Sequence, residues 1–228
     1  GPYLMLAGAL LILAGIFAKL ALPRITSQTG DDTADTRGSA WQYSHLTLGA
    51  IGIFMYVGAE VAIGSTIVNF FTLDSIAGMH EGEAAKYLTY YWGGAMVGRF
   101  IGAAVMQKIS GRTVLAFNAI SAIVLILIAV FLDGMLAMWA ILLVGLCNSV
   151  MFPTIFSLAL NGLGKHTAQG SGILCLAIVG GAVVPLLQGM MADSIGLQWS
   201  FLLPALCYLY IAFYGIKGAK PQAIESGK

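Results

Sequence analysis

Apolar residues gather in seven long segments of the chain, and the joins between them hold most of the charges and helix breakers. The segments cover residues 2–22, 46–71, 86–108, 113–132, 136–160, 169–190 and 197–216. About 20 apolar residues in a helix reach across the hydrocarbon core of a bilayer. The pattern therefore predicts an all-α integral membrane protein that crosses the bilayer several times.

The composition excludes several other classes of protein. Of the 228 residues, 59% are hydrophobic and 9% are charged, whereas soluble domains carry roughly 25% charged residues. A net charge of +1 without a basic stripe gives no footprint for nucleic acid, and no G-x4-G-K-[ST] phosphate loop occurs. The three cysteines lie in apolar segments, and the three histidines lie in separate loops. We expect neither an enzyme nor a metal site.

Lysine and arginine are distributed unevenly between the two faces of the membrane. If the first segment ends in the cytoplasm, nine of the eleven basic residues lie on that side: Lys19, Arg24, Arg37, Lys108, Arg112, Lys165, Lys217, Lys220 and Lys228. The opposite side holds Lys86 and the acidic residues Asp74, Glu81, Glu83, Asp133 and Asp193. Cytoplasmic loops are enriched in Lys and Arg, so we expect a cytoplasmic C-terminus. The remaining basic residue, Arg99, lies within a segment.

The last six segments contain an internal repeat. A shift of 87 residues places WGGAMVGRFIG, from Trp92, on VGGAVVPLLQG, from Val179. One unit of three helices, 46–132, is then repeated over 133–217. Because three is odd, the second copy enters the membrane from the opposite side, and such inverted repeats are typical of secondary transporters. Chance similarity between glycine-rich helices is the alternative, since glycine also favours close packing.

Four stretches resemble a known family. VGAEVAIGSTIVNFF, YYWGGAMVGRFIGA, MFPTIFSLALNGLGKHTAQGSGILCLAIVGGAVVPLLQGMMAD and CYLYIAFYG are similar to the major facilitator superfamily, in the C-terminal half of its fucose:proton symporter branch. The resemblance covers nearly the whole chain. It implies the last helix of the N-terminal half at 1–22, a cytoplasmic linker at 23–45, a six-helix bundle at 46–217 and a cytoplasmic tail at 218–228. Because the chain begins directly with an apolar segment, without the features of a signal peptide, we expect its true N-terminus to be missing.

The resemblance also implies a function. Members of this branch take up glucose, galactose or fucose through the bacterial inner membrane, by alternating access coupled to H⁺ or Na⁺, and need no other cofactor. The expected partners are the sugar, the bilayer and the missing N-terminal half, which holds the best-known coupling carboxylates. The superfamily's G-x3-D-x2-G loop signature matches Gly189, Asp193 and Gly196, so Asp193 is a candidate for gating. The loop from Gly102 to Arg112 lacks the acid of that signature.

Glu60 is the principal candidate for the site. It lies about 14 residues, or roughly 21 Å, from the cytoplasmic start of its helix. An acid at this depth is costly unless something offsets the cost, and it is therefore a hypothesis for a functional site. It could carry a proton or accept hydrogen bonds from sugar hydroxyls, or it could be a structural acid. Arg99 on the next helix could pair with it at full stretch, or could extend to the cytoplasmic surface.

Further polar and aromatic side chains could line a sugar path. Asn118, Asn148 and Gln188 could bond either sugar or neighbouring helices. Asn69 is half a turn from Glu60, so both face one cavity only if the helix breaks near Gly64. Trp92 could stack on a pyranose ring, although an interfacial belt also explains the Tyr90–Trp92 cluster.

The sequence favours a cation-coupled sugar transporter over two alternatives. A non-transporting membrane sensor or scaffold derived from the same fold would bind sugar without counterflow. An efflux carrier for another small solute would fail to recognise glucose in competition experiments.

Overall fold

The computed structural model describes residues 2–19 and 39–219, with the side chains of residues 3–16 and 39–219. The chain divides into two units, 1–38 and 39–228. Helix α1 (Pro2–Lys19) lies in the first unit, and its apolar side chains are exposed. Most of the expected linker at 23–45 and of the tail at 218–228 lies outside the described residues. The end of that linker is helical, because η1 (Ala40–Gln42) and the start of α2 occupy it.

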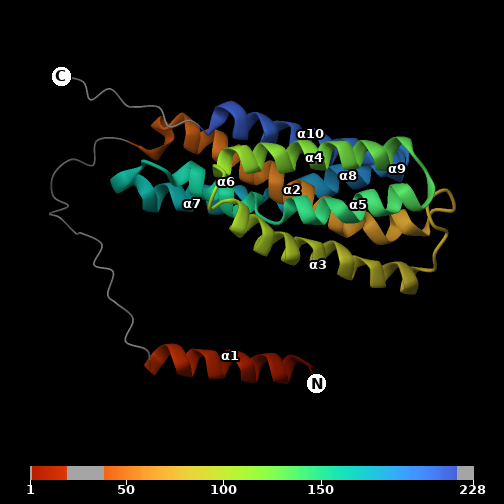
Figure 1. The fold of residues 1–228 in the computed structure, drawn as a ribbon, viewed down its shortest axis with the longest axis horizontal. Coiled ribbons are helices and arrows are strands. Elements are labelled where there is room, and N and C mark those ends of the chain that lie inside the picture. The colour runs from red at the N-terminus through yellow and green to blue at the C-terminus, as the bar shows by residue number, and fades with distance from the viewer. Residues whose placement is uncertain (1, 20–38, 220–228) are drawn as a thin grey trace. The chain divides into compact units, whose positions relative to one another are not determined.

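The first copy of the repeat consists of three uninterrupted helices (Figure 1). They are α2 (Ser44–Thr72), α3 (Glu81–Val105) and α4 (Gly111–Phe131). Glu81 and Glu83 lie in the first turn of α3, where negative charge stabilises the positive end of the helix dipole. The Oγ of Ser110 accepts a hydrogen bond from the Thr113 amide and caps α4.

The second copy consists of three interrupted segments. The first is α5 (Gly134–Asn148) followed by α6 (Met151–Leu160). The second is η2 (Gly164–His166), α7 (Thr167–Ala177) and α8 (Gly180–Ile195). The third is α9 (Leu197–Ser200), α10 (Leu202–Phe213) and the π-helix η3 (Tyr214–Gly218). The described part of the chain thus consists of helices joined by short loops, without strands, as the sequence predicts.

Five helical stretches among the described residues are long and apolar enough to cross a membrane: 44–72, 111–131, 134–160, 164–195 and 197–218. Helix α3 has 25 residues, about 37 Å at 1.5 Å per residue, but its charged ends, Arg99 and its many glycines make it less apolar. In α1, residues 3–16 form a shorter apolar helix. The protein is therefore a multi-pass membrane protein.

Close glycine contacts reproduce the inverted repeat in three dimensions. A Cβ on Gly58 of α2 would collide with Val184 of α8, and a Cβ on Gly145 of α5 would collide with the Tyr91 carbonyl of α3. Gly58 and Gly145 are related by the 87-residue shift, and so are the helices that they contact. Each copy therefore sends its first helix against the second helix of the other copy.

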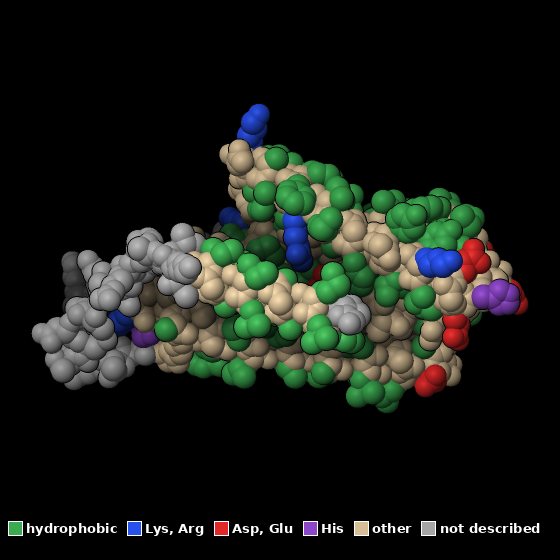
Figure 2. All heavy atoms as spheres, turned by 90° about the horizontal axis from the view of Figure 1, so that it is seen from below, with side chains coloured by type: hydrophobic (Ala, Val, Ile, Leu, Met, Phe, Trp, Pro, Cys, Tyr) green, Lys and Arg blue, Asp and Glu red, His purple; other side chains and the backbone are tan. Residues whose placement is uncertain are grey.

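The charged loops lie at opposite ends of the 39–219 unit. At one end, Gly134 N donates to Ser75 O (2.8 Å) and Gln198 Nε2 donates to Asp133 Oδ1 (3.3 Å), which ties three loops together. Acidic side chains gather at one end of the molecule in Figure 2. At the other end, Arg112 Nη2 donates to Ile216 O (2.7 Å) and His45 Nε2 donates to Asn161 O (2.9 Å).

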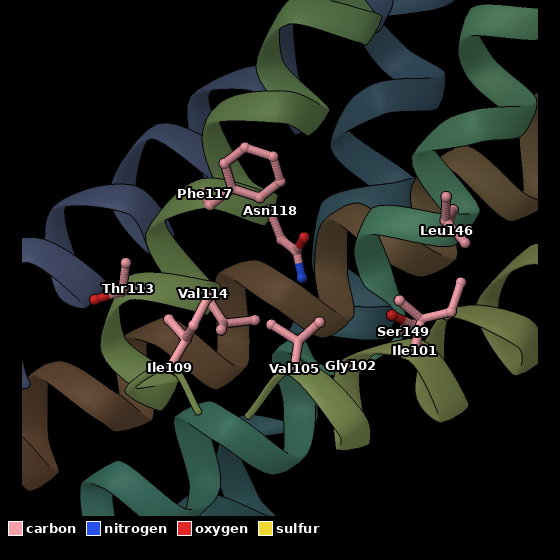
Figure 3. A pocket seen from close by; sticks show the side chains of 11 residues that line it. Ile101, Gly102, Val105, Ile109, Thr113, Val114, Phe117, Asn118, Leu146 and Ser149 are labelled. Atoms are coloured by element: carbon pink, nitrogen blue, oxygen red, sulfur yellow. The ribbon is translucent and has the colours of Figure 1, made fainter. Parts of the chain in front are cut away.

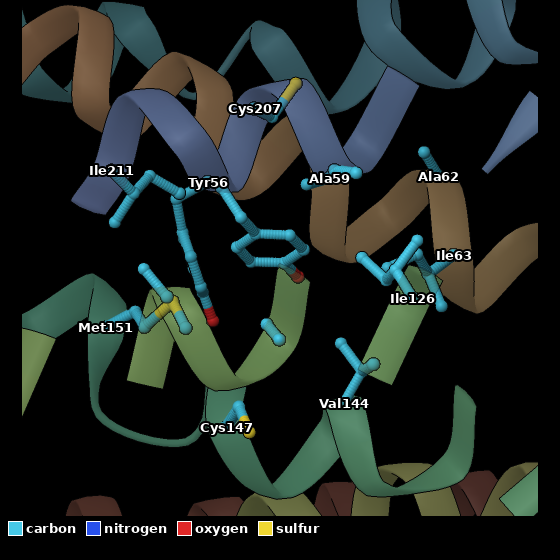
Figure 4. Packing of buried hydrophobic residues seen from close by; sticks show 14 of the residues in the cluster. Tyr56, Ala59, Ala62, Ile63, Ile126, Val144, Cys147, Met151, Cys207 and Ile211 are labelled. Carbon is cyan, nitrogen blue, oxygen red and sulfur yellow. The ribbon is translucent and has the colours of Figure 1, made fainter. Parts of the chain in front are cut away.

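Helix α2 runs through the apolar core, with buried residues along most of its length. Figure 4 shows Ala59 and Ile63 of this helix in an apolar cluster with side chains of α4, α5 and α10, such as Ile126, Val144 and Ile211. The two buried cysteines, Cys147 and Cys207, belong to this cluster as free thiols. The third, Cys175, lies in an apolar segment of the sequence but is exposed on α7.

Candidate functional site

The break between α5 and α6 follows from one proline. In a continuous helix, the carbonyl of Ser149 would accept a hydrogen bond from the amide of residue 153, but Pro153 has no N–H and its ring clashes with that carbonyl. Helix α5 ends at Asn148, and α6 begins at Met151. The carbonyls at the end of α5 then need donors from outside the helix.

Two other helices supply these donors. Arg99 Nε of α3 donates to Ser149 O at 3.3 Å, and the Tyr56 hydroxyl of α2 donates to Asn148 O at 3.0 Å. From the sequence, we expect Arg99 either to pair with Glu60 or to extend to the cytoplasmic surface. The structure gives a third arrangement, in which an exposed guanidinium reaches back to the helix break.

Glu60 lies one turn after Tyr56 on α2, and its side chain is partly buried. Its Oε1 accepts a hydrogen bond from the Tyr56 hydroxyl at 2.8 Å, and its backbone carbonyl accepts one from the Tyr91 hydroxyl at 3.3 Å. Glu60 and Arg99 thus reach adjacent residues of the same break, Glu60 through Tyr56 and Arg99 directly.

The side chain of Asn148 links two tyrosines of the site. It is 1% exposed. Its Nδ2 donates to the Tyr91 hydroxyl at 2.9 Å, and its Oδ1 accepts from the Tyr208 hydroxyl of α10 at 2.6 Å. We call Glu60, Tyr56, Tyr91, Asn148 and Tyr208 the Glu60–Asn148 cluster. It joins α2, α3, α5 and α10, and nearly all of its polar atoms are hydrogen-bonded, as buried polar groups require.

The three tyrosines of the cluster were not candidates from the sequence. Tyr91 was grouped with an interfacial belt, but it is 1% exposed, whereas its neighbours Tyr90 and Trp92 are 59% and 47% exposed. Tyr90 packs near Tyr87 and Trp139, an exposed aromatic group that fits a belt. The i, i+4 spacing of Tyr56 and Glu60 is the one sequence signal that could have identified a partner.

Trp92 lies beside the cluster rather than within it. Its ring is 5.2 Å from that of Tyr91, in an edge-to-face arrangement, and it lies against Gly64. Because Glu60 is partly buried and Trp92 is half-exposed, an aromatic face and a carboxyl group are both accessible on neighbouring helices. An aromatic face next to hydrogen-bonding groups can bind a sugar ring.

The structure leaves Asn69 and Asp193 apart from the cluster. Helix α2 continues without interruption to Thr72, so Asn69 stays on the opposite side of the helix from Glu60 and is exposed. Asp193 is exposed in the last turn of α8, at the acidic end, whereas Arg99 lies near the other end of α3. The structure therefore does not bring Asp193 and Arg99 together.

Gln188 belongs to a separate buried site. Its Nε2 donates to Thr66 Oγ1 at 3.4 Å and to Ser200 Oγ at 3.3 Å, which links α8 to α2 and α9. Both hydroxyls donate to backbone carbonyls. The Oε1 of Gln188 is buried without a hydrogen-bond partner.

Asn118 points into a cavity of about 420 Å³ between α3, α4 and α5 (Figure 3). The lining is mostly apolar and includes Ile101, Val105 and Phe117. Ser149, at the α5–α6 break, forms part of the wall. The cavity therefore connects Asn118 with the break but not with Glu60.

The chain was compared with known proteins. No family model matches it. It is 59% identical over 219 residues to the glucose/galactose transporter of Brucella abortus, a match that covers 96% of the chain and 53% of the relative. It is 31% identical over 219 residues to the L-fucose-proton symporter of Escherichia coli, covering 93% of the chain and 50% of the relative.

A solved structure agrees with these sequence matches. The crystal structure of the fucose:proton symporter of Escherichia coli superposes with a TM-score of 0.86 at 29% identity, over 96% of this chain and 55% of that one. The chain spans about half the length of the curated relatives that it matches. It therefore belongs to the major facilitator superfamily, in the branch that holds the fucose:proton symporter and the bacterial glucose/galactose transporters.

Proposed function

We propose that this chain is the C-terminal half of a secondary active transporter that takes up a hexose or deoxyhexose together with a cation. The observation that carries the proposal is a partly buried carboxyl group, Glu60, within a cluster of tyrosines and an amide among helices of membrane-spanning length. Relatives named as glucose/galactose transporters and fucose symporters support the substrate class.

Glu60 is the proposed proton carrier on this half. An acid inside a membrane protein is costly, and it is typical of proton and ion pathways. When it is neutral, Glu60 can both donate and accept a hydrogen bond. We take H⁺ as the coupling ion, because the carboxyl group of Glu60 lies 2.8 Å from the Tyr56 hydroxyl and can bind and release a proton there without any further ligand.

The remaining parts of the proposal concern the complete protein. The N-terminal half would face the side of the bundle that exposes Trp92 and would complete the sugar site. Residues 1–22 would be the last helix of that half, and 23–45 the linker to the bundle at 46–217. With the basic end in the cytoplasm of a bacterium, as the positive-inside rule favours, the tail at 218–228 is cytoplasmic and the protein lies in the inner membrane.

Glu60→Gln in the complete transporter tests the proposal. We expect concentrative uptake of labelled sugar to fall to the level of equilibration, whereas counterflow of sugar between two pools is retained. Glu83→Gln, which changes an exposed acid at the start of α3, is the matched control. Wild-type accumulation ratios in Glu60→Gln would refute the role of Glu60, and sugar binding without counterflow in the wild type would refute transport.

A further inference from the structure

We propose that the single hydrogen of the Tyr56 hydroxyl is shared between Glu60 and the helix break, so that the proton on Glu60 determines whether the carbonyl of Asn148 has a donor. The inference rests on the proposed function, because it assigns to Tyr56 the step that connects proton binding with movement. Tyr56 is a positioning residue in this scheme.

The geometry places two acceptors around one donor. The Tyr56 hydroxyl lies 2.8 Å from Glu60 Oε1 and 3.0 Å from Asn148 O. A phenol carries one hydrogen, so it cannot serve both oxygens fully at once. Tyr56 is 2% exposed and lies among buried side chains of α5, α6 and α10, including Cys147, Met151 and Cys207 (Figure 4).

The charge on Glu60 decides which acceptor the hydrogen serves. An ionised carboxylate can only accept, and hydrogen bonds to a charged group are stronger than those to a neutral carbonyl. The hydrogen of Tyr56 then points to Glu60, and Asn148 O loses its donor. A neutral Glu60 donates its own proton to the oxygen of Tyr56, and the tyrosine hydrogen is free for Asn148 O.

The other groups near Glu60 are already engaged elsewhere. Tyr91 and Tyr208 use their hydroxyl hydrogens on the Glu60 backbone carbonyl and on Asn148 Oδ1. Arg99 donates from Nε to the next carbonyl, Ser149 O. The thiol of Cys147 is buried in the same apolar cluster as Tyr56. Among these groups, Tyr56 makes the contact with both the carboxyl group and the end of α5.

Asn148 O is a position where one hydrogen bond affects the backbone. It belongs to the last residue of α5, whose side-chain amide is held by hydrogen bonds with Tyr91 and Tyr208. The residues that follow, Ser149 and Val150, form the break, and α6 begins beyond them. The gain or loss of a donor at this carbonyl therefore acts on Ser149 and Val150, which connect α5 to α6.

Amide hydrogen exchange in a double-mutant cycle tests the inference in the complete transporter. Four proteins are compared at one alkaline pH: wild type, Glu60→Gln, Tyr56→Phe and the double variant. The glutamine amide donates to Tyr56 as a neutral acid does, so Glu60→Gln should slow exchange in the peptide covering 149–160 several-fold. In the Tyr56→Phe background, the same change should have no effect.

A matched control and a separate assay keep the outcomes distinct. Tyr210→Phe removes the hydroxyl of a half-buried tyrosine on α10, which donates to Leu48 O at 3.0 Å, and should preserve the full effect of Glu60→Gln. An equal effect in the Tyr56→Phe background, or no effect in the wild-type background, overturns the inference. Uptake measured on the same preparations tests the proposed function separately, since hydrogen exchange requires no transport.

Discussion

The two copies of the repeat differ in how their helices cross the membrane. The first copy has three unbroken helices and no proline, and the second has three interrupted segments with one proline each: Pro153, Pro185 and Pro204. Shifted back by 87 residues, these prolines fall on Thr66, Gly98 and Phe117. Because proline removes a donor and clashes with the preceding turn, the second copy is the one whose carbonyls need partners from elsewhere.

The copies also divide the polar residues between them. Glu60 and Arg99 of the first copy correspond to Cys147 and Leu186 of the second. Conversely, Asn148 and Gln188 of the second copy stand where the first has Val61 and Ile101. The uninterrupted helices thus carry Glu60 and Arg99, and the interrupted segments carry the buried amides Asn148 and Gln188. The two copies of the repeat thus share a similar helix arrangement but carry different polar side chains.

A proline moved into the first copy should have the largest effect. Thr66→Pro places proline at the position equivalent to Pro153, but inside the unbroken helix α2, and should destabilise the protein by about 3 kcal/mol or more. Its reverse, Pro153→Thr, should leave a folded protein. Thermal unfolding of the complete transporter in detergent measures both. Equal unfolding temperatures for the two variants would show that the copies tolerate proline alike.

Alanine at the paired glycines should have the next largest effect. A Cβ on Gly180 would collide with the Phe54 carbonyl of α2, whereas a Cβ on its repeat partner Gly93 meets nothing within 4 Å. Overpacking of this kind costs about 1–3 kcal/mol, so Gly180→Ala should unfold at a lower temperature and Gly93→Ala should not. An equally small change in unfolding temperature for Gly180→Ala and Gly93→Ala would show that α2 and α8 can move apart without loss of stability.

Asn148→Val, which restores the residue of the first copy, should destabilise the fold by about 2 kcal/mol, since it leaves the hydroxyls of Tyr91 and Tyr208 without the amide. The reverse exchange, Val61→Asn, is the control, because Val61 is 36% exposed and an amide there can reach solvent or the other half. The free energies of unfolding of the two variants can be compared by denaturant titration. A stable Asn148→Val would show that the cluster does not hold α3 and α10 together.

Gln188→Ile should have the smallest effect, within about 1 kcal/mol of the wild type. It gives up two long hydrogen bonds, but it also removes the Oε1 atom that is buried without a partner. The same unfolding assay measures it beside Asn148→Val. A loss as large as that of Asn148→Val would mean that Oε1 has a partner, such as a bound water.

The sequence predicted the parts of this protein that depend on patterns along the chain. The length of the apolar segments predicted the helices, and the 87-residue repeat predicted the inverted arrangement of two three-helix units. It did not predict the Glu60–Asn148 cluster, because tyrosines on α2, α3 and α10 are distant in sequence and each resembles an ordinary membrane aromatic. The break at Ser149 was predictable from Pro153, but its donors depend on how three helices meet in space.

The contact between α3 and this break has a mechanical consequence. A Cβ on Gly98 would lie 2.6 Å from the Ser149 side chain and 2.7 Å from Leu146 O, and a Cβ on Gly102 would collide with Val150. At Gly98 and Gly102, α3 has no side chain that could change rotamer, so a rotation at the α5–α6 break would press directly on the α3 backbone. Because the two backbones touch there, we expect a bend at Ser149 to shift α3, and the exposed ring of Trp92 with it.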